Sequence, residues 1–327
     1  MITPRAYLKN NTLSRDIDTA APRDGYGIGL LEVGEKNESI VVLCADVADS
    51  TRSAKFREKY PKRFIQAGIA EQNMVGVATG LALQGKVPFV STYAVFCPGR
   101  TWDQVRVSVC YNRANVKIAG AHAGFSAGPD GATHQALEDI AITRALPGLI
   151  VLAPSDAEET RKAVHLAAEI NGPVYFRYSR NPAPLFTTPQ TPFKVGKATI
   201  FHEGTDVAII GAGPIIHTAL LAADRLIERG VSVCVVNSPS IKPLDEDTIE
   251  KVARQCGAVV TVEEHQIHGG LGSAVAETLG QRYPVPLEMV GMPDMFGESG
   301  EPEQLRAKYR LSLESIVNAV QRVRKRK

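Results

Sequence analysis

The chain has 327 residues, 44% hydrophobic and 22% charged, which is long enough for two domains and too apolar for a disordered protein. Its net charge of +2 provides no overall field for nucleic acid or an anionic membrane. Five cysteines are scattered along it, and no apolar run approaches the ~20 residues that span a bilayer. We therefore expect a cytoplasmic protein with reduced thiols that binds neither nucleic acid nor membrane.

Short apolar runs alternate with amphipathic segments in the first half of the chain. The runs are rich in β-branched and aromatic residues, which predicts strands buried on both faces at 39–46, 87–94, 116–123, 148–155 and 173–179. Helices are predicted at 70–84, 102–112, 136–146 and 156–170, the last with Ser155 and Asp156 as candidate caps. This alternation predicts a parallel sheet covered by helices.

A proline-rich segment, 181–194, interrupts the alternation and is predicted to be a linker. Beyond it, strands are expected at 206–213, 231–238, 258–265 and 287–292, with helices between them. These elements predict a second, smaller α/β domain. We therefore divide the chain into an N-terminal extension (1–19), a first domain (20–180), the linker (181–194) and a second domain (195–327).

Two motifs in the second domain have ordinary structural explanations. "GAGPII" (211–216) lacks the third glycine of a dinucleotide-binding fingerprint, because Ile216 stands in its place, and we interpret it as a tight strand-to-helix turn. "EEHQIHGG" (263–270) places His265 and His268 beside carboxylates, but a strand end that turns into a glycine-opened helix explains it better than a metal site.

The segment "AHAGFSAGPDGATHQ" (121–135) is the densest in chemically useful groups. His122 lies where a predicted buried strand ends, and a glycine-rich loop then carries Asp130 and His134. In a parallel α/β sheet ligands bind at such strand ends, and these side chains offer donors, an acceptor and a proton shuttle. Taken alone, a turn whose polar residues satisfy one another explains the pattern equally well.

Four segments together resemble the pyrimidine-binding domain of thiamine-diphosphate enzymes, most closely that of transketolases. They are "AGIAEQNMVGVATGLAL" (67–83), "STYAVF" (91–96), the His122–Asp130–His134 spacing with "DGATHQ", and "YSRN" (178–181). The resemblance covers residues 20–327, which correspond to the last two domains of a transketolase. It implies a two-domain α/β fold, in which a parallel-sheet domain of the pyrimidine-binding type precedes a smaller domain of the transketolase C-terminal type.

The resemblance gives a function to Glu71, the single acid of an otherwise almost uncharged run. It implies that Glu71 hydrogen-bonds N1′ of the aminopyrimidine of thiamine diphosphate, where a carboxyl that shares its proton with the ring promotes catalysis. Glu71 can also stabilise the positive end of a helix that begins near Gln72. Tyr93 and Phe96 match the aromatic residues that pack against this ring. The segment from Cys97 to Arg100 departs from the family pattern, and we assign it no role.

The same resemblance implies a substrate site. Two guanidiniums, a hydroxyl and an imidazole match the groups that hold the phosphate of a sugar in transketolases: Arg23, Ser50, His122 and Arg180. Asp130 would contact a substrate hydroxyl, and His134 would carry a proton near the reacting carbon. Glu71 and His134 are therefore the expected catalytic residues.

The sequence contains no Gly-Asp-Gly, the motif with which transketolases bind the diphosphate and its metal. By resemblance, this chain supplies the pyrimidine half of the cofactor site. An N-terminal subunit carrying the diphosphate-binding domain would then hold most of the Mg²⁺ or Ca²⁺ site, in an α2β2 assembly. The implied reaction is reversible transfer of a two-carbon ketol unit from a ketose phosphate to an aldose phosphate, as in the pentose phosphate pathway.

A transketolase-like enzyme for a less common sugar phosphate remains open, and so do three alternatives outside the transketolases. Deoxyxylulose-phosphate synthases share "DGATHQ" and the glutamate, but they usually have an acid where His122 stands. The β subunits of 2-oxoacid dehydrogenases have this length and two domains, but their loop lacks the His–Asp–His spacing. A non-catalytic regulatory partner would have no need of Glu71 and both histidines.

Overall fold

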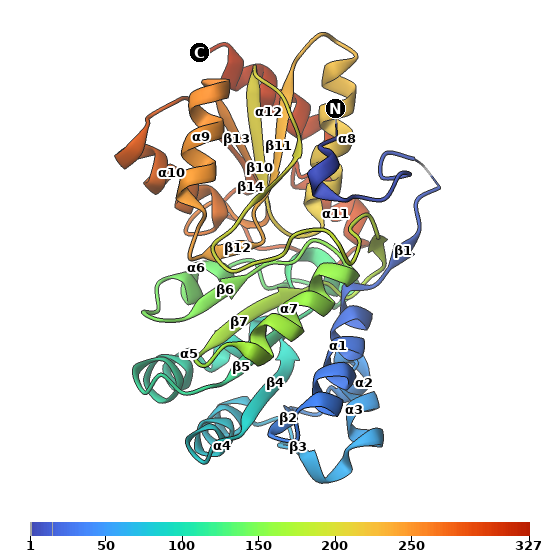
Figure 1. Cartoon of the computed structure of the whole chain (residues 1–327), viewed down its shortest axis with the longest axis vertical. Helices are drawn as coiled ribbons and strands as arrows, with labels where there is room; N and C mark the ends of the chain where they lie inside the picture. Colours follow the sequence, from blue (N-terminus) through green and yellow to red (C-terminus); the bar gives the residue numbers. More distant parts are fainter. Residues whose placement is uncertain (1, 15) are drawn as a thin grey trace.

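Two β-sheets lie one above the other along the long axis of the molecule (Figure 1). The computed structural model describes residues 2–14 and 16–327. In these residues the lower sheet has seven strands and the upper sheet five. This arrangement confirms the α/β fold expected from the alternation of apolar and amphipathic segments.

The seven-stranded sheet has the order β12-β6-β7-β5-β4-β2-β3, and all neighbouring strands are parallel except β12, which is antiparallel to β6. Its strands are β2 (Ile40–Cys44), β3 (Phe64–Gln66), β4 (Val87–Tyr93), β5 (Lys117–Ala121), β6 (Ile150–Leu152), β7 (Val174–Tyr178) and β12 (Ser240–Lys242). Strands β2, β5 and β7 are buried along their whole length, as continuous apolarity predicts for a sheet covered on both faces.

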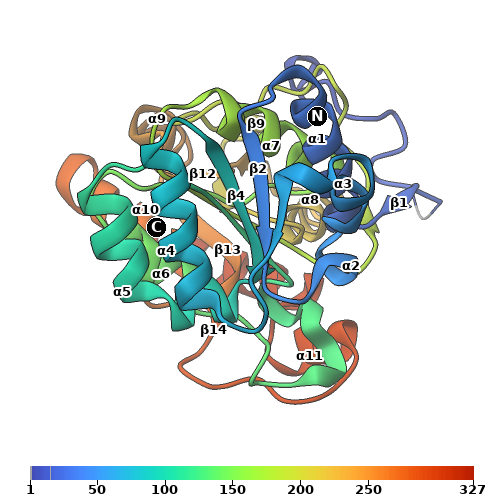
Figure 2. The same ribbon diagram turned by 90° about the horizontal axis from the view of Figure 1, so that it is seen from below.

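Helices cover both faces of this sheet, as the view from below shows (Figure 2). One face carries α4 (Glu71–Leu83), α5 (Trp102–Gln104) and α6 (Asp139–Arg144). Helix α5 continues as a π-helix over Val105–Tyr111. The other face carries α1 (Pro22–Lys36), α2 (Ala48–Thr51), α3 (Ala54–Lys59) and α7 (Ala157–Glu169). The side chain of Asp156 accepts a hydrogen bond from the Glu159 amide, which confirms the predicted cap of α7.

Helix α1 was not expected from the sequence, because its glycines interrupt the apolar pattern. The structure shows why they are needed. A Cβ at Gly25 would lie 1.9 Å from the carbonyl oxygen of Ala157, and one at Gly29 would lie 2.8 Å from Cβ of Val164. Helix α1 therefore crosses α7 so closely that only glycine fits, and this contact fixes the position of Arg23 in the first turn of α1.

The five-stranded sheet has the order β14-β13-β10-β11-β9, with only the edge pair β11–β9 antiparallel. Its strands are β9 (Thr199–His202), β10 (Val207–Gly211), β11 (Val233–Asn237), β13 (Val259–Gln266) and β14 (Leu287–Met292). Its helices are α8 (Ile215–Ile227), α9 (Glu246–Cys256), α10 (Leu271–Arg282), α11 (Pro302–Lys308) and α12 (Leu313–Arg324). Strands β9 and β12 and helix α11 were not anticipated, because each is short.

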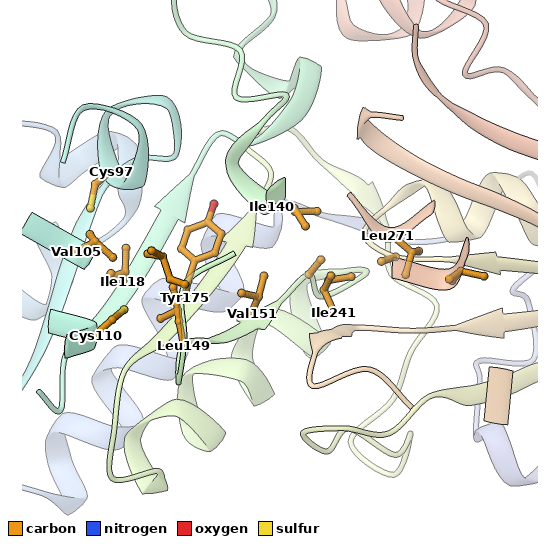
Figure 3. Packing of buried hydrophobic residues seen from close by; sticks show 14 of the residues in the cluster. Cys97, Val105, Cys110, Ile118, Ile140, Leu149, Val151, Tyr175, Ile241 and Leu271 are labelled. Carbon is orange, nitrogen blue, oxygen red and sulfur yellow. The ribbon is translucent and has the colours of Figure 1, made fainter. Parts of the chain in front are cut away.

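The two halves of the chain share a hydrophobic core (Figure 3). Strand β12 crosses from the second half to pair with β6, and Ile241 on it packs in one cluster with Val151, Tyr175 and Leu271. The proline-rich segment contains β8 (Ala183–Pro184), which pairs with β1 (Thr19–Ala20). Because β12 pairs with β6 and β8 pairs with β1, residues from one predicted domain contribute strands to another part of the chain. The predicted domain limits stay a prediction.

The N-terminal segment lies on the upper sheet, beside α8 (Figure 1). The Thr3 amide donates to the carbonyl of Phe201 at 2.9 Å, and Nε2 of His217 lies 2.8 Å from the carbonyl oxygen of Thr12. The predicted extension 1–19 is thus packed against the second half of the chain, apart from positions 1 and 15, which lie outside the described residues. No helix in the part of the chain that the structure describes has the length and apolarity needed to cross a membrane.

Candidate active site

The side chains selected from the sequence gather at the carboxyl ends of four neighbouring strands. Ser50 follows β2, Tyr93 ends β4, His122 comes directly after β5 and Arg180 follows β7. These strands are adjacent and parallel in the order β7-β5-β4-β2, so their carboxyl ends meet at one edge of the sheet. The topology therefore brings together side chains as far apart in the sequence as Ser50 and Arg180, which are separated by 130 positions (180 − 50).

Ser50 lies at the centre of the predicted phosphate cage. The Tyr93 hydroxyl donates to Oγ of Ser50 at 2.9 Å, and Nη1 of Arg23 donates to its carbonyl oxygen at 3.2 Å. Nε2 of His122 lies 3.3 Å from the same carbonyl, and the rings of Tyr93 and His122 are 4.1 Å apart between centroids. The structure thus brings four of the predicted residues into direct contact.

His122 is fully buried in this cage, in a left-handed backbone conformation with φ of 57°. Burial, followed by the positive charge of Arg180, lowers the pKa of His122 to about 3, so its imidazole is neutral at pH 7. Burial, followed by the charge of Arg52, also lowers the pKa of Arg23. Nδ1 of His122 and Nε of Arg23 are buried without a hydrogen-bond partner among residues 2–14 and 16–327. The free Nε–H of Arg23 favours an anionic ligand, whereas Nδ1 of His122, whose ring donates through Nε2, can accept a hydrogen bond from a ligand hydroxyl.

The glycine-rich loop contributes the other polar groups. It forms a 3-10 turn over Gly124–Asp130, and Oδ2 of Asp130 lies 3.3 Å from Nη1 of Arg180. The ring of His134 meets the ring of Phe96 edge-on at 5.3 Å and that of Tyr93 at 6.1 Å. Tyr93 and Phe96 are themselves stacked, with centroids 5.8 Å apart. Both histidines therefore contact the ring of Tyr93, and His134 contacts that of Phe96 as well.

Glu71 is the first residue of α4, and its side chain is only 3% exposed. Its Oε2 atom accepts a hydrogen bond of 2.8 Å from Nη1 of Arg100. Glu71 thus lies in the first turn, where an acid stabilises the positive end of the helix as expected, although α4 has no side-chain cap bond. The carboxylate also forms an ion pair beside the aromatic rings.

Arg100 is the site residue that sequence reasoning missed. Its guanidinium lies 4.6 Å from the centroid of the Phe96 ring while it pairs with Glu71. It belongs to the π-helical turn Val95–Arg100, part of which was assigned no role in the sequence analysis. The available signal was a basic residue four positions after Phe96, at the strand end expected to lie near a lone buried acid.

Glu264, at the end of β13, positions the glycine-rich loop from the second half of the chain. Its Oε1 accepts from the Phe125 amide at 2.6 Å, and its Oε2 accepts from Nε of Arg306 at 2.7 Å. A Cβ at Gly124, where φ is 66°, would lie 2.3 Å from Oε1, so only glycine allows this approach. The loop that carries Asp130 and His134 is thus held by both sheets.

The neighbouring Glu263 accepts from the amides of Leu271 and Gly272, at 2.7 and 2.8 Å. This contact stabilises the start of α10 and confirms the strand-to-helix interpretation of "EEHQIHGG". No group of three His, Cys, Asp or Glu side chains with metal-binding geometry occurs in residues 2–14 and 16–327. The residues suited to an organic cofactor are Glu71, Tyr93 and Phe96, which offer a buried carboxyl beside two ring faces.

Two protein families match the chain. The family described as transketolase, pyrimidine binding domain, matches residues 18–184, and the transketolase C-terminal domain matches residues 196–316. A provisionally named transketolase C-terminal section of Methanocaldococcus jannaschii is 43% identical, over 91% of this chain and 94% of its own length. The 6-deoxy-6-sulfo-D-fructose transketolase subunit SqwH of Clostridium sp. is 42% identical, over 93% of this chain and 95% of its own.

A solved structure described as a split gene transketolase in an inactive beta4 tetramer is 45% identical and superposes with a TM-score of 0.87. The match covers 95% of this chain and all of the other. The transketolase of Campylobacter jejuni shares the fold, with a TM-score of 0.80 at 21% identity, and this chain spans half of it. The chain therefore belongs to the transketolase family, in which it resembles the C-terminal sections of enzymes divided into two chains.

Proposed function

We propose that the chain is the C-terminal subunit of a thiamine-diphosphate-dependent transketolase, which transfers a two-carbon ketol unit between sugar phosphates. One observation carries this proposal. A buried carboxyl (Glu71), two stacked rings (Tyr93, Phe96) and a cage with an unpaired guanidinium donor (Arg23) and an unpaired imidazole nitrogen (His122) share one edge of the sheet. This combination suits an aminopyrimidine next to an anionic substrate.

The aromatic end of the site fits the pyrimidine half of the cofactor. The faces of Tyr93 and Phe96 provide a stacking surface, and the Glu71 carboxyl offers an oxygen to a ring nitrogen away from water. When bound, thiamine diphosphate supplies the nucleophilic carbon that takes up the ketol unit. Glu71 holds or shares the proton at N1′, and the two rings orient the heterocycle.

The cationic end of the site fits a phosphate. Ser50 Oγ accepts the Tyr93 hydroxyl, so its own proton is available to an oxygen of the substrate. Arg23 and Arg180 provide charge, and Nδ1 of His122, whose ring donates through Nε2 to the Ser50 carbonyl, can accept a hydrogen bond from a substrate hydroxyl. The Asp130–Arg180 pair places a carboxylate at the entrance, where it can accept a substrate hydroxyl.

His134 lies between the two ends of the site, in edge contact with both rings. We assign to it the transfer of a proton to and from the substrate oxygen during cleavage and formation of the carbon–carbon bond. Thr133 Oγ1 lies 2.9 Å from Nδ1 of His134 and so fixes the orientation of its ring. His134 thus connects the glycine-rich loop, which carries it, with the two aromatic rings that it contacts.

An exposed face beside Glu71 supports a partner subunit. Apolar side chains of Ile69, Val77, Leu83, Val107 and Tyr111 are exposed on α4 and its neighbours. A Cβ at Gly76 or Gly80 would meet no described atom within 4 Å, so the surface of α4 is open along this stripe. We assign this face to the assembly with an N-terminal subunit that holds the diphosphate and its Mg²⁺ or Ca²⁺, in an α2β2 arrangement.

The test compares the chain alone with the chain plus a protein that carries Gly-Asp-Gly. Both receive thiamine diphosphate, Mg²⁺, xylulose 5-phosphate and ribose 5-phosphate, and sedoheptulose 7-phosphate is measured. We expect activity only in the mixture, and a loss of kcat of about 10³-fold in Glu71→Gln. Lys55→Met, a change at an exposed position, is the control and should keep full activity. Activity of Glu71→Gln equal to that of the control would contradict the proposal.

The identity of the substrate needs its own arm of the experiment. Two relatives are named for 6-deoxy-6-sulfo-D-fructose and apulose 4-phosphate. The cage around Ser50 can hold a sulfonate as well as a phosphate, because both present three oxygens to the same donors. Each of these sugars should therefore be offered as donor in parallel with xylulose 5-phosphate. The largest kcat/KM identifies the substrate class, and the role of Glu71 is the same in every case.

A further inference from the structure

Arg100 makes the two contacts that the proposed function reserves for the aminopyrimidine. Its Nη1 atom donates to Oε2 of Glu71 at 2.8 Å, and its guanidinium lies 4.6 Å from the centroid of the Phe96 ring. A guanidinium is flat, carries N–H donors in its plane and stacks on aromatic faces, as a protonated aminopyrimidine does. Arg100 and the heterocycle therefore compete for the same carboxyl and the same ring face.

We propose that Arg100 holds the place of the aminopyrimidine in the cofactor-free subunit, and that cofactor binding displaces it from Glu71 and Phe96. This inference rests on the proposed function, since it takes Glu71 as the partner of N1′. It identifies Arg100 as a determinant of cofactor affinity in addition to the residues that bind the cofactor.

The surroundings of Arg100 allow this movement. Its side chain is 47% exposed, whereas that of Glu71 is 3% exposed, so the cation can turn into solvent while the carboxylate stays in place. Gln72 Nε2 donates to the carbonyl of Arg100 at 3.2 Å, which anchors the backbone of the turn to α4. Displacement therefore needs only side-chain rotation.

The placeholder also has a physical purpose. Without a partner the Glu71 carboxylate would be a buried charge with no donor, and such a group destabilises the fold. Pairing with Arg100 removes this cost until the cofactor arrives. The same pairing occupies Oε2 of Glu71, an oxygen that the proposed role offers to N1′. Release of Arg100 thus couples cofactor binding to the active form of the site.

The experiment measures the affinity of the full-length chain, mixed with its partner subunit and Mg²⁺, for thiamine diphosphate. Trp102 is the single tryptophan of this chain and lies two residues beyond Arg100, with its Nε1 bonded to the Ile142 carbonyl at 2.8 Å. Its fluorescence provides a binding signal that is independent of turnover. Isothermal titration of the same mixtures checks the values.

We expect Arg100→Ala to bind thiamine diphosphate about fivefold more tightly than wild type, because one half-exposed ion pair no longer has to be broken. Arg100→Lys, which keeps the charge but lacks the planar fork, should fall between the two. Arg229→Ala removes an exposed arginine in the turn after α8, far along the chain, and should leave the affinity unchanged. This pattern would support the placeholder.

Equal or weaker binding by Arg100→Ala, in a mixture where wild type binds and Glu71→Gln binds poorly, would overturn the placeholder and leave the proposed function intact. Failure of every variant and of wild type to bind thiamine diphosphate with the partner present would overturn the proposed function itself. The thermal midpoint of Arg100→Ala should stay within a few degrees of wild type, and a native circular dichroism spectrum confirms that the comparison concerns folded protein.

Discussion

Strand β5 has a buried basic residue at each end, and the two differ in how completely they are hydrogen-bonded. Lys117 opens the strand and is fully buried, and its Nζ is 2.6 Å from Oδ1 of Asn115 and 2.7 Å from the carbonyls of Ile170 and Gly172. His122 follows the strand and is equally buried, but its Nδ1 finds no partner in the described residues. Both burials cost free energy, and the fold compensates the first completely but the second only through Nε2 of His122.

The difference distinguishes a structural group from a binding group. Three acceptors surround the amine of Lys117, so its hydrogen bonds are complete within the protein. At the carboxyl end of the strand the Nε–H of Arg23 remains available to an anionic substrate, and Nδ1 of His122 remains available to a substrate hydroxyl. Burial alone therefore does not mark the site. Incomplete hydrogen bonding at the strand ends does.

The largest expected effect is a loss of stability at Lys117, the end of β5 where the hydrogen bonds are complete. Lys117→Met should lower the free energy of unfolding by about 3 kcal/mol, because it leaves the half-buried carbonyls of Ile170 and Gly172 without their side-chain donor. Urea denaturation followed by circular dichroism measures this loss. The folded variant should keep the KM for sugar phosphate, since β5 separates Lys117 from the site. Lys55→Met, at an exposed position, is the matched control and should unfold like wild type.

At the other end, Arg23→Met should leave the stability nearly unchanged and raise the KM for the sugar phosphate about 30-fold, the value of a charged hydrogen bond of about 2 kcal/mol. Steady-state kinetics of the assembled enzyme provides the measurement. Arg229→Met removes an equal charge elsewhere and should leave KM unaffected. A large loss of stability in Arg23→Met without a change in KM would assign Arg23 to the fold instead of the substrate.

The pH dependence of stability offers a finer test of His122. Its pKa falls from 6.5 to about 3 on folding, because burial and then Arg180 disfavour the imidazolium. Above pH 6.5 the ring is neutral in both states. As the pH falls from 6.5 towards 3, the unfolded chain takes up a proton that the folded chain excludes, and stability is lost by up to about 1.4 kcal/mol per pH unit. In His122→Gln the free energy of unfolding should fall less steeply over this window, because unfolding takes up one proton fewer. Urea denaturation at several pH values measures the two slopes.

The smallest expected effect concerns the hydroxyl that links the two ends of the site. Tyr93→Phe keeps the ring that faces Phe96 but removes the hydrogen bond to Ser50. We expect about a fivefold rise in the KM for sugar phosphate, with kcat and the affinity for thiamine diphosphate nearly unchanged, because Ser50 loses about 1 kcal/mol of orientation. If instead the cofactor affinity falls and KM does not change, Tyr93 acts only through its ring.

Much of the fold could be predicted from the sequence because strand and helix periods are local properties. Continuous apolar runs such as Val174–Tyr178 and the cap of α7 at Asp156 need no distant information. The helix α1 escaped prediction for a tertiary reason, since its glycines serve the contact with Ala157 and Val164. The strand β12 escaped because three residues paired to the other sheet carry no local signal.

The sequence by itself determined which chemistry the chain can offer: a buried acid, two aromatic rings, and imidazoles and guanidiniums after apolar strands. Tertiary structure alone decided which of these groups meet, because parallel strands bring the ends of β2, β4, β5 and β7 to one edge. It also decided that Glu71 pairs with Arg100. Spacing along the chain reveals neither the meeting of the strand ends nor the Glu71–Arg100 pair. The first depends on the order of the strands in the sheet, and the second on how the turn at Arg100 folds back over α4.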